Sequence, residues 1–404
     1  MRPRVARRAH GALRCALAAA LALALPRPAA AQLGPLTGYY LNVPGDAGSS
    51  ALGDGGWSDY QRLRLMLTPA LGPLRLDAAY EQLFLFQQRP GAAFTALAPG
   101  TAPTSGDWLG LDWTLEQSAH VLWRQRLDRL SLALPLGSVQ VTAGRQAISW
   151  ATTLLFTPAD PFAPFDPSDP FREYRGGVDA LRVQVFPGPF SGLDVVVRPE
   201  RTATGRTMTA AARGTLSVGS LDLSAWGGVV DGTAAGAAGA TGTVAGAAWR
   251  TEVTLREDTT GAAVVRVAAG LDRRWTVFGR DLYAVVEIQH DGFGAAGPGQ
   301  LAAVLASAPY RRGELQVLGR DVAAGEVQYQ VHPLVSGELL ILWDLGDGSA
   351  LIAPALAVSA SNDLTVRVGA YLPAGNGSVS PLGGLGSEFG IAPTFGYASA
   401  SWFF

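Results

Sequence analysis

The chain has 404 residues, of which 48% are hydrophobic and 16% are charged, and it contains 50 glycines and 26 prolines. This composition argues against a disordered or nucleic-acid-binding chain, and a mean hydropathy of +0.18 favours a membrane protein. No stretch after the N-terminus reaches the roughly 18 apolar residues that a membrane helix needs. Two classes remain: a soluble globular protein of two or three domains, and a membrane barrel with its apolar residues at alternate positions.

Residues 1–31 have the parts of a secretory signal peptide. Five Arg flank an apolar run over residues 16–25, and three Ala form an A-x-A cleavage site before Gln32. A short membrane anchor is the alternative, but an anchor needs a longer apolar span. Cleavage would leave 25 Arg against 33 acids over residues 32–404, a net charge of −8. It would also remove Cys15, the only cysteine, so the exported chain would have no disulfide.

After residue 31, apolar and polar side chains alternate. Leu63, Leu65 and Leu67 share one parity, and Arg62 and Arg64 share the other. Successive side chains of a strand point to opposite faces, so this run has one apolar and one polar face. The same period recurs near residues 74–81, 181–185, 249–256, 282–289, 326–332 and 364–372. No helical stripe of comparable length is present.

Short and long connections also alternate. Tight turns are predicted near residues 69–73, 135–138, 187–190, 218–220, 245–248, 277–280, 333–335 and 361–363. Longer segments are predicted near residues 45–56, 88–120, 150–177, 231–238, 292–320 and 373–388. Tight turns at one end and long loops at the other are typical of an outer-membrane barrel. Strands counted from 36–43 to 390–404 number about 18, with 16 as the lower bound.

We therefore predict an all-β fold, a single transmembrane antiparallel β-barrel over residues 32–404 in the bacterial outer membrane. A soluble β-sandwich is the alternative, but it would not place Arg, Asp and Glu opposite the apolar face in nearly every strand while also filling a core. The aromatic-rich end, residues 397–404, resembles the C-terminal signal by which outer-membrane barrels are recognised for insertion. The expected partners are membrane lipid and, through Phe404, the barrel-assembly machinery.

Residues 32–404 contain few side chains that could bind a metal or catalyse a reaction. His120, His290 and His332 form no His-x-x-x-His pair, and no cysteine follows residue 31, so neither a metal site nor a cofactor is predicted. No Ser–His or Asp–His set stands out as a catalytic site, and we predict no enzyme. The Gly/Ala run 232–246 lacks the Lys-Ser/Thr pair and the strand–helix context of a phosphate loop. A flexible surface loop is expected there instead.

The segment 150–177 is rich in proline, aromatic and acidic residues. Its five prolines hold it extended and cannot donate to a β ladder. We expect it either to fold into the pore mouth and form a constriction, where rings of charge act as a filter, or to cover the rim as an external loop. The candidate constriction residues are Asp160, Asp166, Asp169, Arg172, Glu173 and Arg175.

The strands that flank this segment carry a family resemblance. The order Gly144-Arg145-Gln146, a long loop, and then Val178-Asp179-Ala180-Leu181-Arg182 resembles the alginate-export and related porin-like outer-membrane barrels of proteobacteria. The resemblance covers roughly residues 140–185 by motif and implies an 18-stranded outer-membrane channel. One departure is Ser149-Trp150-Ala151, which stands where that family often has Tyr-Gly-Asp.

The polar residues opposite the apolar faces are predicted to line the pore. Nine Arg stand against seven acids in this presumed lumen, whereas the resemblance implies a dominant basic lining, so alginate itself is not expected as the solute. The predicted pore-lining residues are Arg62, Arg64, Arg75, Asp77, Glu81, Arg182, Gln184, Arg250, Glu252, Arg256, Arg266, Glu287, Glu326 and Arg367, and the tally adds Asp194, Arg198 and Asp272.

Two functions fit this prediction. The first is a passive channel or exporter for hydrophilic solutes or polysaccharide, because a barrel of 16–18 strands can enclose an aqueous lumen. The second is a non-conducting barrel that binds or anchors surface polysaccharide through its loops. In that case Trp108, Trp113, Phe162 and Phe165 would stack on sugars, although loop packing or a membrane-interface belt also explains such aromatics. We expect the channel.

Overall fold

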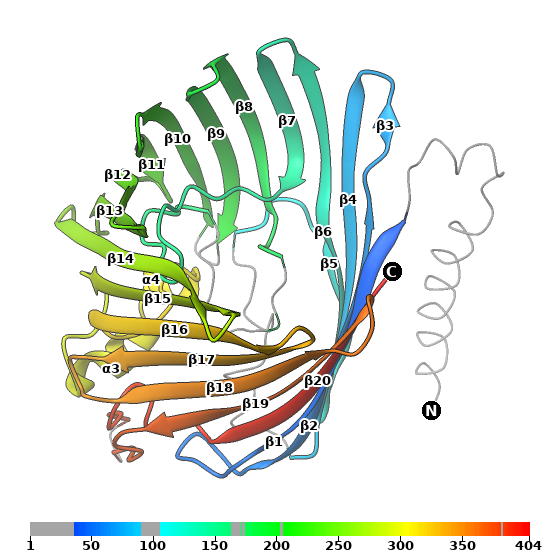
Figure 1. Cartoon of the computed structure of the whole chain (residues 1–404). Helices are drawn as coiled ribbons and strands as arrows, with labels where there is room; N and C mark the ends of the chain where they lie inside the picture. The colour runs from blue at the N-terminus through cyan, green and yellow to red at the C-terminus, as the bar shows by residue number, and fades with distance from the viewer. Residues whose placement is uncertain (1–35, 90–105, 163–170, 172–173, 203–204, 381–382) are drawn as a thin grey trace, which may run out of the picture.

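A computed structural model describes residues 36–89, 106–162, 171, 174–202, 205–380 and 383–404. These residues form one closed antiparallel sheet with two short helices (Figure 1). The predicted signal peptide lies outside the described residues. Among the described residues, no helix is long enough and apolar enough to cross a membrane.

Eighteen strands build the wall of the barrel, and each pairs antiparallel with its neighbours. The ring closes where β20 pairs back to β1, with Tyr39 opposite Phe403. The wall strands are β1 (Thr37–Ala47), β2 (Gly56–Leu67), β4 (Leu74–Gln87), β6 (Val121–Leu136), β7 (Val139–Gln146), β8 (Val178–Gly188), β9 (Ser191–Thr202), β10 (Gly205–Val218), β11 (Leu221–Val230), β12 (Thr233–Val244), β13 (Ala247–Glu257), β14 (Ala263–Val277), β15 (Arg280–Asp291), β16 (Asp321–His332), β17 (Val335–Asp344), β18 (Ala350–Ser359), β19 (Leu364–Ala374) and β20 (Phe395–Phe403). The predicted strand number is therefore confirmed.

Four shorter elements lie outside this ring. The two-residue β3 (Ala70–Leu71) pairs with the start of β4, and β5 (Asp112–Gln117) pairs with β6. The helices α3 (Pro298–Leu305) and α4 (Ala308–Arg311) lie in the connection between β15 and β16.

The outer face of the wall is apolar because of the period-2 sequence pattern. On β13, Val253 and Leu255 are exposed on the outside, while Glu252 and Arg256 are buried on the inside. Closure of the ring pairs the wall backbone, as a lipid environment requires. The outer face of β1 and β2 is an exception, because Asn42 and Gln61 both donate hydrogen bonds to the Asp59 carboxylate at 2.6 Å.

The predicted tight turns all connect neighbouring strands, but one predicted loop is wrong. The Gly/Ala run 232–246, with the expected loop at 231–238, forms strand β12, which pairs along its length with β11 and β13. Its small residues make room for larger neighbours, since a Cβ on Gly239 would lie 2.4 Å from the Thr152 hydroxyl. The last strand begins at Phe395, so residues 390–394 belong to the preceding connection.

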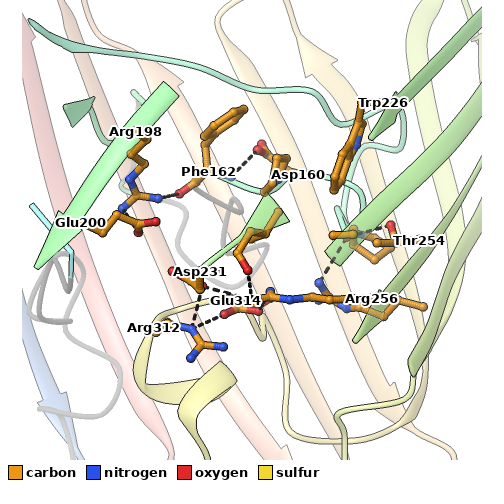
Figure 2. A pocket seen from close by; sticks show the side chains of 15 residues that line it. Asp160, Phe162, Arg198, Glu200, Trp226, Asp231, Thr254, Arg256, Arg312 and Glu314 are labelled. Carbon is orange, nitrogen blue, oxygen red and sulfur yellow. Dashed lines mark hydrogen bonds and ion pairs between the residues drawn. The ribbon is translucent and has the colours of Figure 1, made fainter. Parts of the chain in front are cut away.

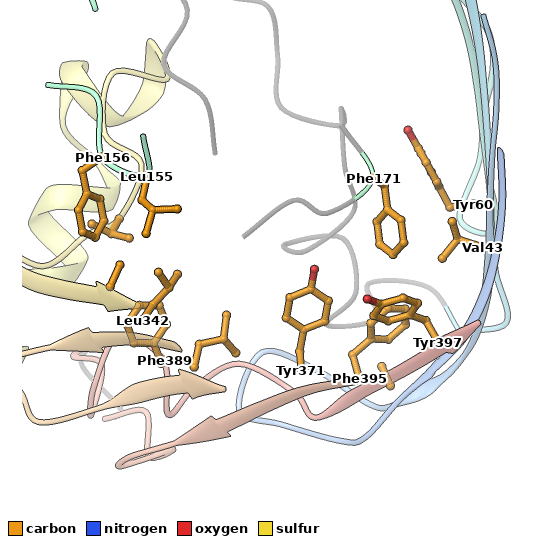
Figure 3. Close-up of a cluster of buried hydrophobic side chains, with 14 of the residues drawn as sticks. Val43, Tyr60, Leu155, Phe156, Phe171, Leu342, Tyr371, Phe389, Phe395 and Tyr397 are labelled. Atoms are coloured by element: carbon orange, nitrogen blue, oxygen red, sulfur yellow. The ribbon is translucent and has the colours of Figure 1, made fainter. Parts of the chain in front are cut away.

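The largest buried hydrophobic cluster lies inside the ring (Figure 3). Tyr371, Phe395 and Tyr397 project from β19 and β20, and Val43 and Tyr60 project from β1 and β2. An inner face that is polar in nearly every strand was expected, and this part of the wall corrects that expectation. Its inward side chains are apolar because residues from the connections pack on them, as the next subsection describes.

Candidate functional site

The candidate site is the lumen and the described parts of the segment inside it, residues 147–162, 171 and 174–177, called the inward segment below. Its two ends are joined by the motif residues that carry the family resemblance. Arg145 and Asp179 are opposite each other in the β7–β8 register, and Arg145 Nε donates to Asp179 Oδ1 at 2.8 Å. Arg145 also pairs with Asp107 at 3.0 Å and with Asp112 at 3.1 Å. These motif residues therefore hold the two ends of the inward segment together.

Glu252 on β13 binds the first part of the inward segment. Its carboxylate accepts hydrogen bonds from the backbone N–H groups of Thr152 (2.7 Å), Thr153 (3.2 Å) and Ala159 (2.9 Å). The segment has turned back on itself to present these three donors. Since Glu252 is only 1% exposed, the bonds form out of contact with water, where charged hydrogen bonds are strong.

Glu287 on β15 makes a second clamp of the same kind. It accepts hydrogen bonds from the backbone N–H groups of Leu154 (2.7 Å), Leu155 (2.8 Å) and Phe156 (2.9 Å), and it is also 1% exposed. Two inward carboxylates thus satisfy six amides of an irregular segment that has no ladder partner of its own.

The other end of the inward segment contacts β2 and β6. Arg62 donates to the Phe171 carbonyl at 3.0 Å, and Arg129 donates to the Arg175 carbonyl at 2.5 Å. The Phe171 ring lies 4.9 Å from the Tyr397 ring on β20 (Figure 3). In the ring of 18 strands, β2 and β6 lie seven to nine positions away from β13 and β15. The inward segment is therefore anchored on opposite walls, inside the barrel.

The candidate constriction residues are only partly described. Asp160 pairs with Arg175 at 3.0 Å, and the Asp160 side chain is buried. The structure therefore brings together two of the six predicted residues, as an ion pair within the inward segment. Asp166, Asp169, Arg172 and Glu173 lie outside the described residues.

The predicted pore-lining residues form two tiers. Those level with the inward segment are buried: Glu252, Arg256, Arg266 and Glu287 are each 6% exposed or less. Those nearer the short turns are partly open. Arg182 pairs with Asp194 at 2.5 Å, Arg250 with Asp272 at 3.0 Å, and Arg367 with Glu338 at 3.2 Å, and these side chains are 14–27% exposed. Gln184 lies near Gln140 in this open tier, Glu326 accepts a bond from Gln328, and Arg75 is exposed.

Arg62, Arg64 and Glu81 belong to a larger charged network on β2, β4 and β6. Asp128 pairs with Arg64 at 2.6 Å and with Arg129 at 2.7 Å, and Arg126 pairs with Glu81 at 2.9 Å. Sequence reasoning missed the three β6 members of this network. A bulge opposite Ala79 and Tyr80 shifts the parity of β6, so that consecutive residues 128 and 129 both face inward. Four Arg against two acids leave this network with an excess positive charge.

A small cavity of about 30 Å³ lies between the inward segment and the wall (Figure 2). Asp231 pairs there with Arg256 at 3.1 Å and with Arg312 at 2.9 Å. Burial raises the pKa of Asp231, but the Arg312 and Arg256 guanidiniums outweigh burial and hold that pKa below its usual value. The carboxylate is therefore charged at neutral pH. A cavity of this size holds one or two waters and no organic solute.

A second cavity, of about 450 Å³, lies near the short-turn end. Arg75, Asp77 and Ser131 line it together with Thr68 and Ala133. This cavity is large enough for a small solute beside charged side chains.

Two of the four aromatic residues predicted to stack on sugars, Phe162 and Trp108, are engaged within the protein. Phe162 is buried and packs edge-on against Trp150, with ring centres 4.9 Å apart. The Arg201 guanidinium lies 4.6 Å from the ring centre of Trp108. Trp113 is exposed, and Phe165 lies outside the described residues. Phe162 is therefore a packing residue and has no free face for a sugar.

The histidines and acids of the described residues form no cluster of three or more that could hold a metal ion. His290 contacts Asp321 at 2.7 Å at the outer rim, and His120 contacts the Gln87 carbonyl at 3.0 Å. The His332 ring accepts a bond from the Leu334 amide in a turn.

Solved structures with the same architecture are outer-membrane barrels. The chain superposes on OpdK of Pseudomonas aeruginosa, solved with vanillate, with a TM-score of 0.52 and 11% identity over 92% of this chain and 99% of that one. OccAB1 of Acinetobacter baumannii gives a TM-score of 0.54 and 8% identity, over 92% and 97%. Wzi of Escherichia coli, described as a carbohydrate-binding barrel involved in capsule assembly, gives 0.52 and 9%, over 93% and 85%.

At these identities the likeness establishes the fold alone. Neither a protein-family model nor a curated protein matches the sequence. The closed 18-stranded wall, its apolar outer face and these structural neighbours agree: the chain has the fold of the porin-like β-barrels of bacterial outer membranes.

Proposed function

We propose that this protein is an outer-membrane channel for small hydrophilic solutes, restricted by the inward segment. The observation that carries the proposal is the contrast between the two tiers of inward charges. Ion pairs near the short turns are partly exposed, whereas the wall carboxylates Glu252 and Glu287 are buried under the inward segment. An open vestibule on the periplasmic side that leads to a narrow passage is the arrangement of a filtering channel.

The geometry favours small solutes over a polymer. Described parts of the inward segment are bonded to opposite walls, so a polysaccharide chain would have to displace these bonds. The ion pairs of the open tier, such as Arg250–Asp272, balance basic and acidic groups and suit hydrated solutes of either sign. The specific relation to alginate-export barrels stays a prediction from the motif. The proposed channel needs no catalytic residue, metal or cofactor.

The alternative is a non-conducting barrel that binds surface polysaccharide. The anchoring of described parts of the inward segment on opposite walls supports this alternative, and Wzi is a carbohydrate-binding barrel with a related fold. The aromatic residues weigh against it, because Phe162 is buried and Trp108 is covered by a guanidinium.

Single-channel recording in planar bilayers tests the proposal. The wild type should conduct weakly, and Glu252→Gln/Glu287→Gln should conduct several-fold more, because each Gln turns an amide NH₂ toward backbone N–H donors and releases the inward segment. Glu326→Gln/Glu338→Gln removes the same charge from inward positions whose partners are Gln328 and Arg367 on the wall, and it is the matched control. If folded, inserted protein fails to conduct in both the wild type and the released variant, the channel is excluded.

A further inference from the structure

Two arginines are opposite each other at the long-loop end of the β9–β10 hairpin. Arg201 and Arg206 are direct partners in the register, and both are exposed. Their guanidiniums lie 4.6 and 5.5 Å from the ring centre of Trp108. Like charges at directly opposed positions destabilise a sheet, so the repulsion between Arg201 and Arg206 has to be offset.

Both arginines belong to the outer face of the barrel. They share the parity of Val197 and Met208, which are 37% and 46% exposed on that face, while Arg198 and Thr209 on the other parity are buried inside. The proposed channel therefore does not use Arg201 or Arg206.

Their depth corresponds to the membrane boundary. The outward positions of β10 from Val218 to Met208 are all apolar or glycine. Ten residues at about 3.4 Å each, in a strand tilted by about 45°, span about 24 Å, which matches the apolar band of about 25 Å in such barrels. Arg206 is the next outward residue beyond this band, at the end that carries the long loops.

No acid of the described residues neutralises this arginine pair. Within the described part of the chain, neither Arg201 nor Arg206 forms an ion pair. The neighbouring segments 90–105 and 203–204, whose placement is not described, contain no Asp or Glu. Glu200 has the opposite parity, is buried inside, and pairs with Arg198 at 3.1 Å. Trp108 offsets part of the repulsion through its ring face but adds no charge.

We propose that Arg201, Arg206 and Trp108 form a binding site for the phosphate group of an outer-leaflet lipid. Two guanidiniums offer several N–H donors in the planar geometry that phosphate oxygens accept. A lipid headgroup lies at the depth of these side chains, and an indole ring is suited to the same boundary. A free phosphate has the same chemistry, and the test separates these two sources.

The test uses the full-length barrel in detergent and native mass spectrometry. The probes are bisphosphorylated lipid A, lipid A without its phosphates, and inorganic phosphate. We expect the wild type to retain bisphosphorylated lipid A about tenfold more strongly than the dephosphorylated form, and Arg201→Gln/Arg206→Gln to lose this preference. Arg273→Gln/Arg274→Gln, at the short-turn end of β14, is the charge-matched control and should keep the preference.

Each outcome decides the proposal. Retention that does not depend on the phosphates, or equal retention by Arg201→Gln/Arg206→Gln, overturns the site. Binding of inorganic phosphate at the same concentrations, with displacement of lipid A, assigns the site to a soluble anion and overturns the lipid assignment. Unchanged heat-modifiable mobility on a gel shows that each variant is folded, so a loss of binding is not a loss of structure.

Discussion

Glu388 is a buried acid in the connection between β19 and β20. Its carboxylate accepts hydrogen bonds from the backbone N–H groups of Leu318 at 2.6 Å and Gly319 at 2.8 Å. Burial raises the pKa of Glu388 to about 8; the two amide bonds oppose this shift, and the nearby Asp344 and Asp347 carboxylates add to it. This residue therefore ties two long connections together in a manner that depends on pH.

The sign of that dependence follows from proton binding. Between the unfolded pKa of about 4.3 and the folded value of about 8, the folded state binds more protons. The contact between the connections should therefore be most stable below about pH 4.3, weaken as the pH rises through this window, and change no further above about pH 8. Hydrogen exchange at Leu318 and Gly319, corrected for intrinsic rates, should lose on the order of 100-fold protection between pH 5.5 and 8.5, because most of the shift from about 4.3 to about 8 falls in this window. Glu388→Gln should remove the trend; a wild type without it would contradict the pKa argument.

For single residues, the sequence predicts which face of the barrel a side chain occupies better than it predicts the hydrogen-bond partner of that side chain. Parity alone placed Glu252 and Glu287 on the inner face, where the structure has them. Their partners are backbone amides roughly 100 to 130 residues away, and nothing in the local pattern signals that contact. Asp128 and Arg129 escaped detection for another reason, because the β6 bulge breaks the alternation on which parity depends.

Two wall carboxylates, Glu252 and Glu287, accept the hydrogen bonds that hold the first part of the inward segment. Limited proteolysis tests this, since the described part of the segment contains Arg175 as a trypsin site. The wild type should resist cleavage after Arg175, and Glu252→Gln/Glu287→Gln should be cut about a hundredfold faster or more, because losing one charged hydrogen bond at each carboxylate costs roughly 1.5–3 kcal/mol. Glu326→Gln/Glu338→Gln should be cut at the wild-type rate. Equal rates for all three proteins would show that the carboxylates do not hold the segment.

The strands with strong alternation were predictable, and the elements without it were not. β12 consists largely of Gly, Ala and Thr, which have weak or mixed strand preferences, and it is a strand because β11 and β13 supply ladder partners on both sides. The helices α3 and α4 are short and lie in a long connection. They are too short for a pattern of apolar residues at helical spacing to predict them.

For the whole molecule, the barrel has two kinds of inner wall. The side formed by β19, β20 and β1 is lined mainly with aromatic and aliphatic residues, whereas β2, β4 and β6 and the side from β8 to β15 carry ion pairs. The inward segment contacts both, through Phe171 on one side and its backbone amides on the other. Alternation alone predicts a barrel with a polar lumen. It does not predict an apolar inner face, because that face depends on which connection folds onto it.

The seam between β1 and β20 closes the barrel through backbone hydrogen bonds. The Phe404 amide donates to the Gly38 carbonyl at 3.0 Å, and Gly38 N–H donates to the Phe404 carbonyl at 2.8 Å, so closure uses backbone atoms that Phe404→Ala retains. We expect Phe404→Ala protein refolded in detergent to keep its thermal stability. Gly38→Val should fail to refold, because its Cβ would lie 2.3 Å from the Arg64 carbonyl oxygen. A Phe404→Ala protein as unstable as Gly38→Val would show that the Phe404 side chain, and not the backbone alone, holds the seam.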